Sequence, residues 1–118
     1  MPVTGIGGVF FRADDPHALQ AWYEKHLGIG HDFAAPWRQE AGTTLFMAFP
    51  KSTDYFPAAK AWMINFRVTA LDALLAKLRE AGVEVVTKAE WDSPETGRFA
   101  RLHDPEGNPV ELWEPPAS

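Results

Sequence analysis

Cysteine is absent from the sequence, which excludes disulfides, thiolate nucleophiles and cysteine-based zinc sites. Positive charge is also scarce: 11 Lys and Arg residues against 16 Asp and Glu residues give a net charge of −5, which disfavours nucleic acids and anionic membranes as partners. No apolar run approaches transmembrane length, and the opening MPVTGIGGVF lacks the basic and apolar regions of a signal peptide. We therefore expect a cytoplasmic protein that binds neither nucleic acid nor membrane.

The 118 residues, of which 46% are hydrophobic, suit one globular domain, and this domain contains an internal repeat. The segment FFRADDPHALQAWYEKHLG, which starts at Phe10, is echoed by NFRVTALDALLAKLREAG, which starts at Asn65; the Phe-Arg and Ala-Leu pairs share one offset. Each copy is typical of a strand, a turn, a helix, a glycine and further short strands. We predict a single domain, 1–118, with one module over about 4–58 and a second over about 60–115.

Both helices have clear signals in the sequence. The first is predicted to begin after an N-cap at Asp14 or Asp15, with Pro16 at its first position, and to end at Gly28. The second is predicted to end at Gly82. Their buried faces are given by apolar residues at helical spacing: Leu19, Trp22, Tyr23 and Leu27 in the first, and Leu71, Leu74, Leu75 and Leu78 in the second.

Short strands are predicted around the helices. In the first module they are IGGVFFRA, HDFAAPW and TTLFMAF, and in the second the strand around Ile64 is followed by VEVVT, RFARLH and PVELW. The turn HDPEGN joins the last two as a hairpin, with Asp104 suited to position i, Pro105 to i+1 and Gly107 to a positive φ. Asp104 and Glu106 are then turn residues, and His103 is expected to be solvent-exposed or bonded to the turn.

Strand alternation indicates which side chains could face a pocket. In each half-buried strand the apolar set should face a helix, so the residues between them face the other way. If this opposite face is concave, it forms a cleft with aromatic walls, two cations and one anion. The residues predicted on it are Phe10, Arg12, Met63, Asn65, Arg67, Glu111 and Trp113.

The paired modules, the opening VFFRADDP and the closing DPEGNPVELWEP resemble the vicinal oxygen chelate superfamily, which includes glyoxalase I, bleomycin-resistance proteins and extradiol dioxygenases. The resemblance covers nearly the whole chain. It implies an α+β fold in which two βαβββ modules form a curled mixed sheet with helices on the convex face and the site on the concave face. It also implies a homodimer, because members of this superfamily commonly pair through sheet edges and helices.

The same resemblance places the family's metal ligands at four positions of this chain, and only one of them retains ligand chemistry. These positions are Gly8, a residue near Phe46, a residue at or beside Met63, and Glu111. Glycine and phenylalanine offer no donor, and a thioether is a poor ligand for a hard divalent ion. We therefore expect no metal or other cofactor.

Three functions stay open at this point. The first is metal-free binding of a small, anionic or aromatic molecule, as in the bleomycin-resistance proteins; Arg12 and Arg67 would suit a carboxylate or phosphate. The second is a metal-free lyase or isomerase that uses Glu111 as a general base. The third is a metal-dependent glyoxalase-type lyase with displaced ligands. In the first reading, Glu111 should be ionised and paired with Arg12 or Arg67.

Overall fold

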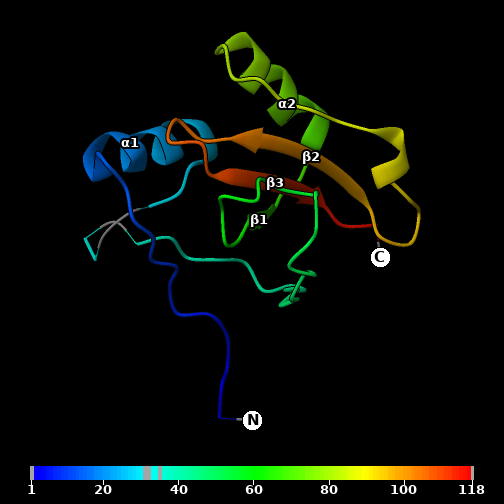
Figure 1. The fold of residues 1–118 in the computed structure, drawn as a ribbon, viewed down its shortest axis with the longest axis horizontal. Coiled ribbons are helices and arrows are strands. Elements are labelled where there is room, and N and C mark those ends of the chain that lie inside the picture. The colour runs from blue at the N-terminus through cyan, green and yellow to red at the C-terminus, as the bar shows by residue number, and fades with distance from the viewer. Residues whose placement is uncertain (1, 31–32, 35, 118) are drawn as a thin grey trace.

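The computed structural model describes residues 2–30, 33–34 and 36–117, and within them the protein is an α+β fold. Its helices are α1 (Pro16–Leu27), α2 (Leu71–Glu80) and a short 3-10 helix, η1 (Ala89–Trp91). Its strands are β1 (Ile64–Arg67), β2 (Arg98–His103) and β3 (Pro109–Glu114) (Figure 1). No helix in the described part of the chain is long and apolar enough to cross a membrane.

The sheet is mixed and open. Its strand order is β1-β3-β2, in which β1 runs parallel to β3 and β2 runs antiparallel to it. A single bridge between Val86 and Arg101 continues the sheet beyond β2. The second module is therefore a β-α-β-β-β unit whose second strand is reduced to one bridge. The α+β class and the mixed sheet expected from the sequence are confirmed.

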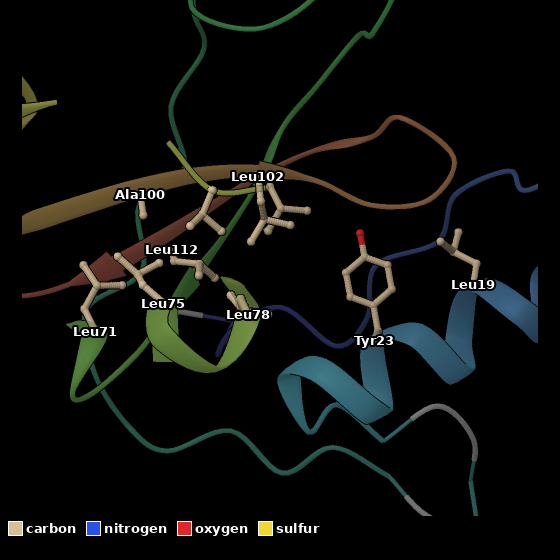
Figure 2. Packing of buried hydrophobic residues seen from close by; sticks show 10 residues of the cluster. Leu19, Tyr23, Leu71, Leu75, Leu78, Ala100, Leu102 and Leu112 are labelled. Carbon is tan, nitrogen blue, oxygen red and sulfur yellow. The ribbon is translucent and has the colours of Figure 1, made fainter. Parts of the chain in front are cut away.

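Both helices bury their apolar faces against one side of this sheet (Figure 2). Leu71, Leu75 and Leu78 of α2 have at most 3% of their surface exposed. The sheet side of the core is formed by Ala100, Leu102, Val110 and Leu112, and α1 adds Leu19 and Tyr23. The predicted inner faces of the helices are thus confirmed, with Trp22, Leu27 and Leu74 partly buried against the same core.

The ends of α1 follow the sequence signals. Asp15 is the N-cap, and its Oδ1 accepts a hydrogen bond from the Ala18 amide at 3.1 Å. Pro16 occupies the first helical position, where no intrahelical amide bond is lost. Gly28 closes the helix with φ 68°, a conformation that costs glycine little because it has no Cβ.

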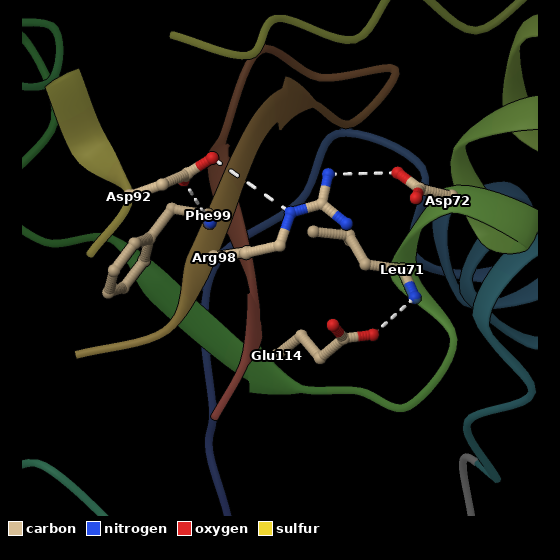
Figure 3. Close-up of polar contacts among 6 residues, drawn as sticks. All are labelled: Leu71, Asp72, Asp92, Arg98, Phe99 and Glu114. Atoms are coloured by element: carbon tan, nitrogen blue, oxygen red, sulfur yellow. Dashed lines mark hydrogen bonds and ion pairs between the residues drawn. The ribbon is translucent and has the colours of Figure 1, made fainter. Parts of the chain in front are cut away.

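Helix α2 is fixed to the sheet by polar contacts at its start (Figure 3). Its N-cap, Ala70, has a positive φ of 51° and provides no side-chain cap. Instead, Glu114 at the end of β3 accepts a hydrogen bond from the Leu71 amide at 2.8 Å. Arg98 on β2 pairs with Asp72 at 2.8 Å, on the solvent side. A carboxylate at the amino end of a helix also suits the helix dipole.

Side chains of the β2–β3 turn hold the two modules together through contacts with α1. The Asp104 carbonyl accepts from the Gly107 amide at 2.9 Å, which confirms the predicted turn, and His103 is exposed as expected. The buried Asp104 carboxylate also accepts the Tyr23 hydroxyl of α1 at 2.6 Å. Glu106 accepts from the backbone amides of Asp14 and Asp15, at 2.6 and 3.0 Å. Figure 1 shows this turn beside α1.

The strands predicted in the first module are not formed within the described residues. No strand or bridge is formed in residues 2–13, 33–34 and 36–49, or in residues 50–63, which lead into β1. His31, Asp32 and Ala35 lie outside the described residues. A β-strand is stabilised by a neighbouring backbone, and these segments have none. Their apolar pattern is nonetheless partly used, because Phe11 packs edge-on against Tyr23 with ring centroids 6.4 Å apart.

Candidate functional site

The face of the sheet opposite the helices carries a polar and aromatic set. Strand register pairs Asn65 and Arg101 with Glu111 on either side, and pairs Arg67 and Phe99 with Trp113. Cross-strand partners point to the same side of a sheet, so these side chains share one face. We call it the polar face: Asn65, Arg67, Phe99, Arg101, Glu111 and Trp113. The strand alternation predicted for Asn65, Arg67, Glu111 and Trp113 is confirmed.

Glu111 lies at the centre of the polar face, with 7% of its surface exposed. Its Oε1 accepts a hydrogen bond from the Asn65 amide at 2.7 Å, and its Oε2 accepts one from the Tyr55 hydroxyl. Within the described residues, neither Arg12 nor Arg67 forms an ion pair with it, so the expected partner is wrong. Two neutral donors take the place of an arginine.

Tyr55 reaches this carboxylate from the loop that precedes β1. Burial is the main cause that raises the pKa of Tyr55 to about 12, and its hydrogen bond to Glu111 acts in the same direction. The hydroxyl therefore stays protonated at neutral pH and donates to Glu111. The ring stacks on Phe49 with centroids 5.8 Å apart and meets Trp91 edge-on at the same separation. An aromatic cluster thus covers the centre of the polar face.

Arg101 is the most unusual residue of the site. Only 8% of its surface is exposed, and its guanidinium carbon lies 4.4 Å from the centre of the Tyr55 ring and 5.9 Å from that of Trp91. Such stacking stabilises a cation. Its Nε and Nη2 atoms are buried and have no hydrogen-bond partner among the described residues. Buried donors without acceptors are costly and therefore rare in folded proteins.

The other two arginines of the predicted site are used differently. Arg67 donates from Nη1 to the Thr43 carbonyl at 2.5 Å and from Nη2 to the Glu40 carbonyl at 2.6 Å, so it holds the first-module loop. Arg12 is exposed and lines a hollow of about 230 Å³ with Lys60, Glu106 and Asn108, beside the β2–β3 turn. Neither guanidinium takes part in the cluster around Glu111.

The remaining predicted site residues are spread along the polar face and beyond it. Trp113 is 7% exposed, donates its indole N–H to the Thr96 carbonyl at 2.7 Å, and stacks on Phe99 with an interplanar angle of 9°. Met63 precedes β1 and is half-buried. Phe10 is 94% exposed and lies over Gly8, so the structure does not bring it into contact with the Glu111 cluster. Trp113 is thus held in place on the polar face, whereas Phe10 lies outside it.

The donors around Glu111 do not fit a metal ion. Its neighbours with measured contacts are an amide and a phenol, and both carboxylate oxygens already accept hydrogen bonds. Within the part of the chain that the structure describes, no group of three or more His, Cys, Asp or Glu side chains could hold a metal. A protein-bound divalent ion ordinarily needs about three such ligands.

The geometry can now be compared with known proteins. The family model of the glyoxalase-like domain matches residues 8–113. The chain belongs to the glyoxalase-like domain family. The resemblance to the vicinal oxygen chelate superfamily is thereby confirmed. The match spans α1, the loop that carries Tyr55 and the sheet up to Trp113, so the polar face lies entirely within the glyoxalase-like domain.

One of the solved structures with a similar fold matches this chain over nearly its full length. It is the crystal structure of TnmS3, an antibiotic binding protein from Streptomyces sp. CB03234, with a TM-score of 0.60 and 24% sequence identity over 98% of each chain. At this identity the likeness shows a common fold. The comparison with curated proteins gave no match.

Three residues of the candidate site were missed by the sequence reasoning: Tyr55, Trp91 and Arg101. For Arg101 a signal was present, because alternation within RFARLH places it opposite the apolar pair Ala100 and Leu102. Tyr55 lies in a loop and Trp91 at the end of the short helix η1, where strand alternation carries no information. Their placement depends on tertiary folding.

Proposed function

We propose that this glyoxalase-like protein binds a small aromatic or anionic molecule against the polar face of its sheet and does so without a metal. The observation that carries the proposal is the cluster of Arg101, Glu111, Tyr55 and Trp91, in which two charged side chains are buried among aromatic rings. Ligand sites typically combine apolar, aromatic walls with a few converging polar groups.

The energetic cost of this cluster favours a functional role. Moving a guanidinium and a carboxylate out of water costs several kcal/mol each unless they are well paired. Here Glu111 is bonded to neutral groups and two donors of Arg101 are unused. Charged groups that are buried at such a cost in free energy are concentrated in binding and catalytic sites. The description of TnmS3 as an antibiotic binding protein supports binding as the activity of a chain with the same fold.

The metal-free character of the proposal rests on ligand chemistry. Of the four positions that correspond to the family's ligands, Gly8, Phe46 and Met63 provide no hard donor. Glu111, the fourth, is engaged by Tyr55 and Asn65. We expect the purified protein to contain no stoichiometric transition metal and to keep its melting temperature in chelator. Elemental analysis that finds near-equimolar zinc, nickel or manganese, lost in Glu111→Gln, would contradict this.

A thermal-shift screen tests the binding function. A ligand present at a hundredfold excess over its Kd stabilises the folded state by about 2.7 kcal/mol, which a melting curve detects readily. The panel should pair aromatic acids with their neutral amides, and aromatic compounds with aliphatic ones of equal size. Trp91→Ala removes one aromatic ring of the cluster. Trp37→Ala is the control, because Trp37 lies outside the cluster and is 45% exposed. Binding that survives both substitutions unchanged would place the ligand elsewhere.

We further propose that the protein is a homodimer. Many apolar side chains of the first module are exposed, including Phe46 at 96% and Met47 at 68%. Strand β1 lies at an edge of the sheet, and an unpaired edge offers a backbone for a partner strand. A second copy supplies both an apolar surface and a strand edge of matching chemistry. Sedimentation should give a dimer that Phe46→Asp weakens; a monomer at every concentration would contradict it.

Catalysis by Glu111 is the second candidate, and one contact favours it. The Tyr55 hydroxyl and the Glu111 carboxylate form a partly buried donor–acceptor pair, an arrangement that can carry a proton to or from a bound substrate. A lyase or isomerase would then act on the ligand. A turnover assay with hemithioacetals of α-keto aldehydes tests it, and activity lost in Glu111→Gln with binding intact would favour an enzyme.

A further inference from the structure

Arg101 has an unused edge of a particular shape. Its two unpartnered atoms, Nε and Nη2, lie on the same side of the planar guanidinium group. Two N–H bonds that point in parallel from this edge match the two oxygens of a carboxylate, the geometry that makes arginine–carboxylate pairs strong and directional. A single neutral acceptor would satisfy only one of the two donors. The edge is therefore suited to a carboxylate.

The other arginines near the sheet do not offer such an edge. Both terminal nitrogens of Arg67 are bonded to backbone carbonyls, and Arg98 pairs with Asp72 and Asp92 at 2.8 and 3.9 Å. Arg12 is exposed to solvent. Unlike Arg12, Arg67 and Arg98, Arg101 is buried, surrounded by rings and left with two free donors.

Tyr55 packs against the face of this guanidinium group. Its ring stacks on the Arg101 guanidinium while its hydroxyl bonds Glu111, so one phenol touches both charged groups. The Tyr55 loop, residues 50–60, contains no helix or strand and is held by short turn contacts such as Thr53 to Pro50 and Lys60 to Pro57. A loop without regular structure opens more readily than the strands that it covers, and its displacement would uncover Arg101.

From this geometry we infer that Arg101 anchors the carboxylate of a planar aromatic acid, whose ring packs against Trp91 once Tyr55 has moved aside. The inference rests on the proposed binding function and names its ligand class. The carboxylate supplies the acceptors that Arg101 lacks, and the flat ring attached to it can take over the contact that the Tyr55 ring makes with Trp91. Glu111 on β3 is the cross-strand partner of Arg101 on β2. Its carboxylate repels a second acidic group, so a monocarboxylate is favoured.

The test uses a matched pair of probes, 2-naphthoate and its neutral isostere 2-naphthamide, titrated calorimetrically into the full-length protein. In the wild type we expect 2-naphthoate to bind at least about tenfold more tightly than the amide, as two charge-assisted hydrogen bonds would give. In Arg101→Met the ratio should fall to about one. Arg101→Lys keeps the charge but loses the paired donors, so its ratio should lie between the two.

Two further variants separate this role from a structural one. Arg67→Met should leave the naphthoate-to-naphthamide ratio unchanged, because Arg67 is bonded to the loop backbone. Tyr55→Ala should tighten naphthoate binding, since the competing ring is removed. If Arg101 served only to stack on the rings, its substitution would lower the melting temperature without changing the ratio.

The outcomes distinguish this inference from the proposed function. Wild-type protein that shows no preference for 2-naphthoate over 2-naphthamide, or that binds neither, overturns the role of Arg101. The binding function would still stand if other members of the thermal-shift panel bind and Trp91→Ala weakens them. A preference that persists in Arg101→Met and disappears in Arg67→Met would assign the carboxylate to Arg67 instead.

Discussion

The two halves of this chain have related sequences and very different structures. Of the large hydrophobic side chains that are exposed among the described residues, eleven lie between Val3 and Phe49, and the second module has two, Trp62 and Val86. The buried hydrophobic residues are distributed the other way, with only Leu19 and Tyr23 in the first half. The same strand–helix pattern has thus produced a sheet in the second module and mainly extended chain in the first.

The difference shows that an alternating apolar pattern does not suffice for a strand. In the second module β3 lies between two neighbours, so each strand gains both backbone bonds and a core. The first module gains a helix, which satisfies its own backbone, and otherwise depends on individual contacts with the second. They include Tyr23 with Asp104, Glu106 with the start of α1, and Tyr55 with Glu111.

The largest predicted effect compares one leucine from each half. Leu112 on β3 is 0% exposed, and Leu45 is 55% exposed. Leu112→Ala should lower the free energy of unfolding by about 2–5 kcal/mol, because it removes buried methyl groups and leaves a cavity. Leu45→Ala should change it by less than about 0.5 kcal/mol. Urea denaturation measures both.

Protein concentration sharpens this comparison. A cost at Leu45 that grows with concentration would place that side chain in the interface of the proposed homodimer, because dimer stability depends on mass action. Equal, concentration-independent costs at Leu45 and Leu112 would contradict the contrast between the two halves.

The next prediction concerns Asp104, which connects the two halves of the chain. The Asp104 carboxylate accepts bonds from the Tyr23 hydroxyl, from the Glu106 and Asn108 amides, and from the Asn108 side chain. Asp104→Ala should cost about 1–3 kcal/mol, since it leaves buried donors unpaired. Hydrogen exchange should show α1 losing more protection than α2. Uniform loss in both helices would mean that Asp104 stabilises only its own turn.

Sequence reasoning succeeded where local rules decide the outcome. Both helices, the caps of α1 and the β2–β3 turn depend on neighbouring residues, and they were predicted correctly. Strand alternation also placed Asn65, Arg67, Glu111 and Trp113 on one face, because register preserves side-chain parity once the strands pair.

The same reasoning failed where the outcome depends on loops and on the choice of partner strand. It expected an arginine at Glu111, but Arg67 is used by the Glu40 and Thr43 carbonyls and Arg12 lies beside the turn. Tyr55 takes that place from a loop whose path no periodicity describes. The first-module strands were predicted from pattern alone, and a pattern does not say which edge will pair with them.

A smaller effect should appear at alkaline pH. The pKa of Tyr55 is raised from 10.0 to about 12, and burial followed by the bond to Asp104 raises that of Tyr23 as well. The folded state therefore holds these protons more tightly than the unfolded state does. The resulting stability is complete below about pH 10 and is lost as the pH rises from 10 towards 12.

The chain contains only two tyrosines, so each can be followed separately. The ultraviolet absorbance of tyrosinate should stay low at pH 10, where an unperturbed tyrosine would be half ionised. Tyr55→Phe and Tyr23→Phe should each remove one of the two late titrations and part of the alkaline loss of stability. A tyrosine that titrates near pH 10 in the folded protein would show that its hydroxyl is not held by the carboxylate.

The smallest predicted effect concerns Glu111, whose role depends on how the two halves meet. Had Glu111 been paired with a buried arginine, its removal would have left an unpaired charge and cost about 3–5 kcal/mol. Its observed partners are the neutral side chains of Asn65 and Tyr55. Glu111→Gln keeps one carbonyl acceptor and fits the same space, so we expect a loss of only about 1 kcal/mol by urea denaturation. Glu111→Gln should also relieve repulsion of a bound carboxylate and tighten 2-naphthoate more than 2-naphthamide. A loss near 4 kcal/mol would instead mean that the carboxylate balances the buried charge of Arg101 across the strand, and the two residues would then act as one ion pair.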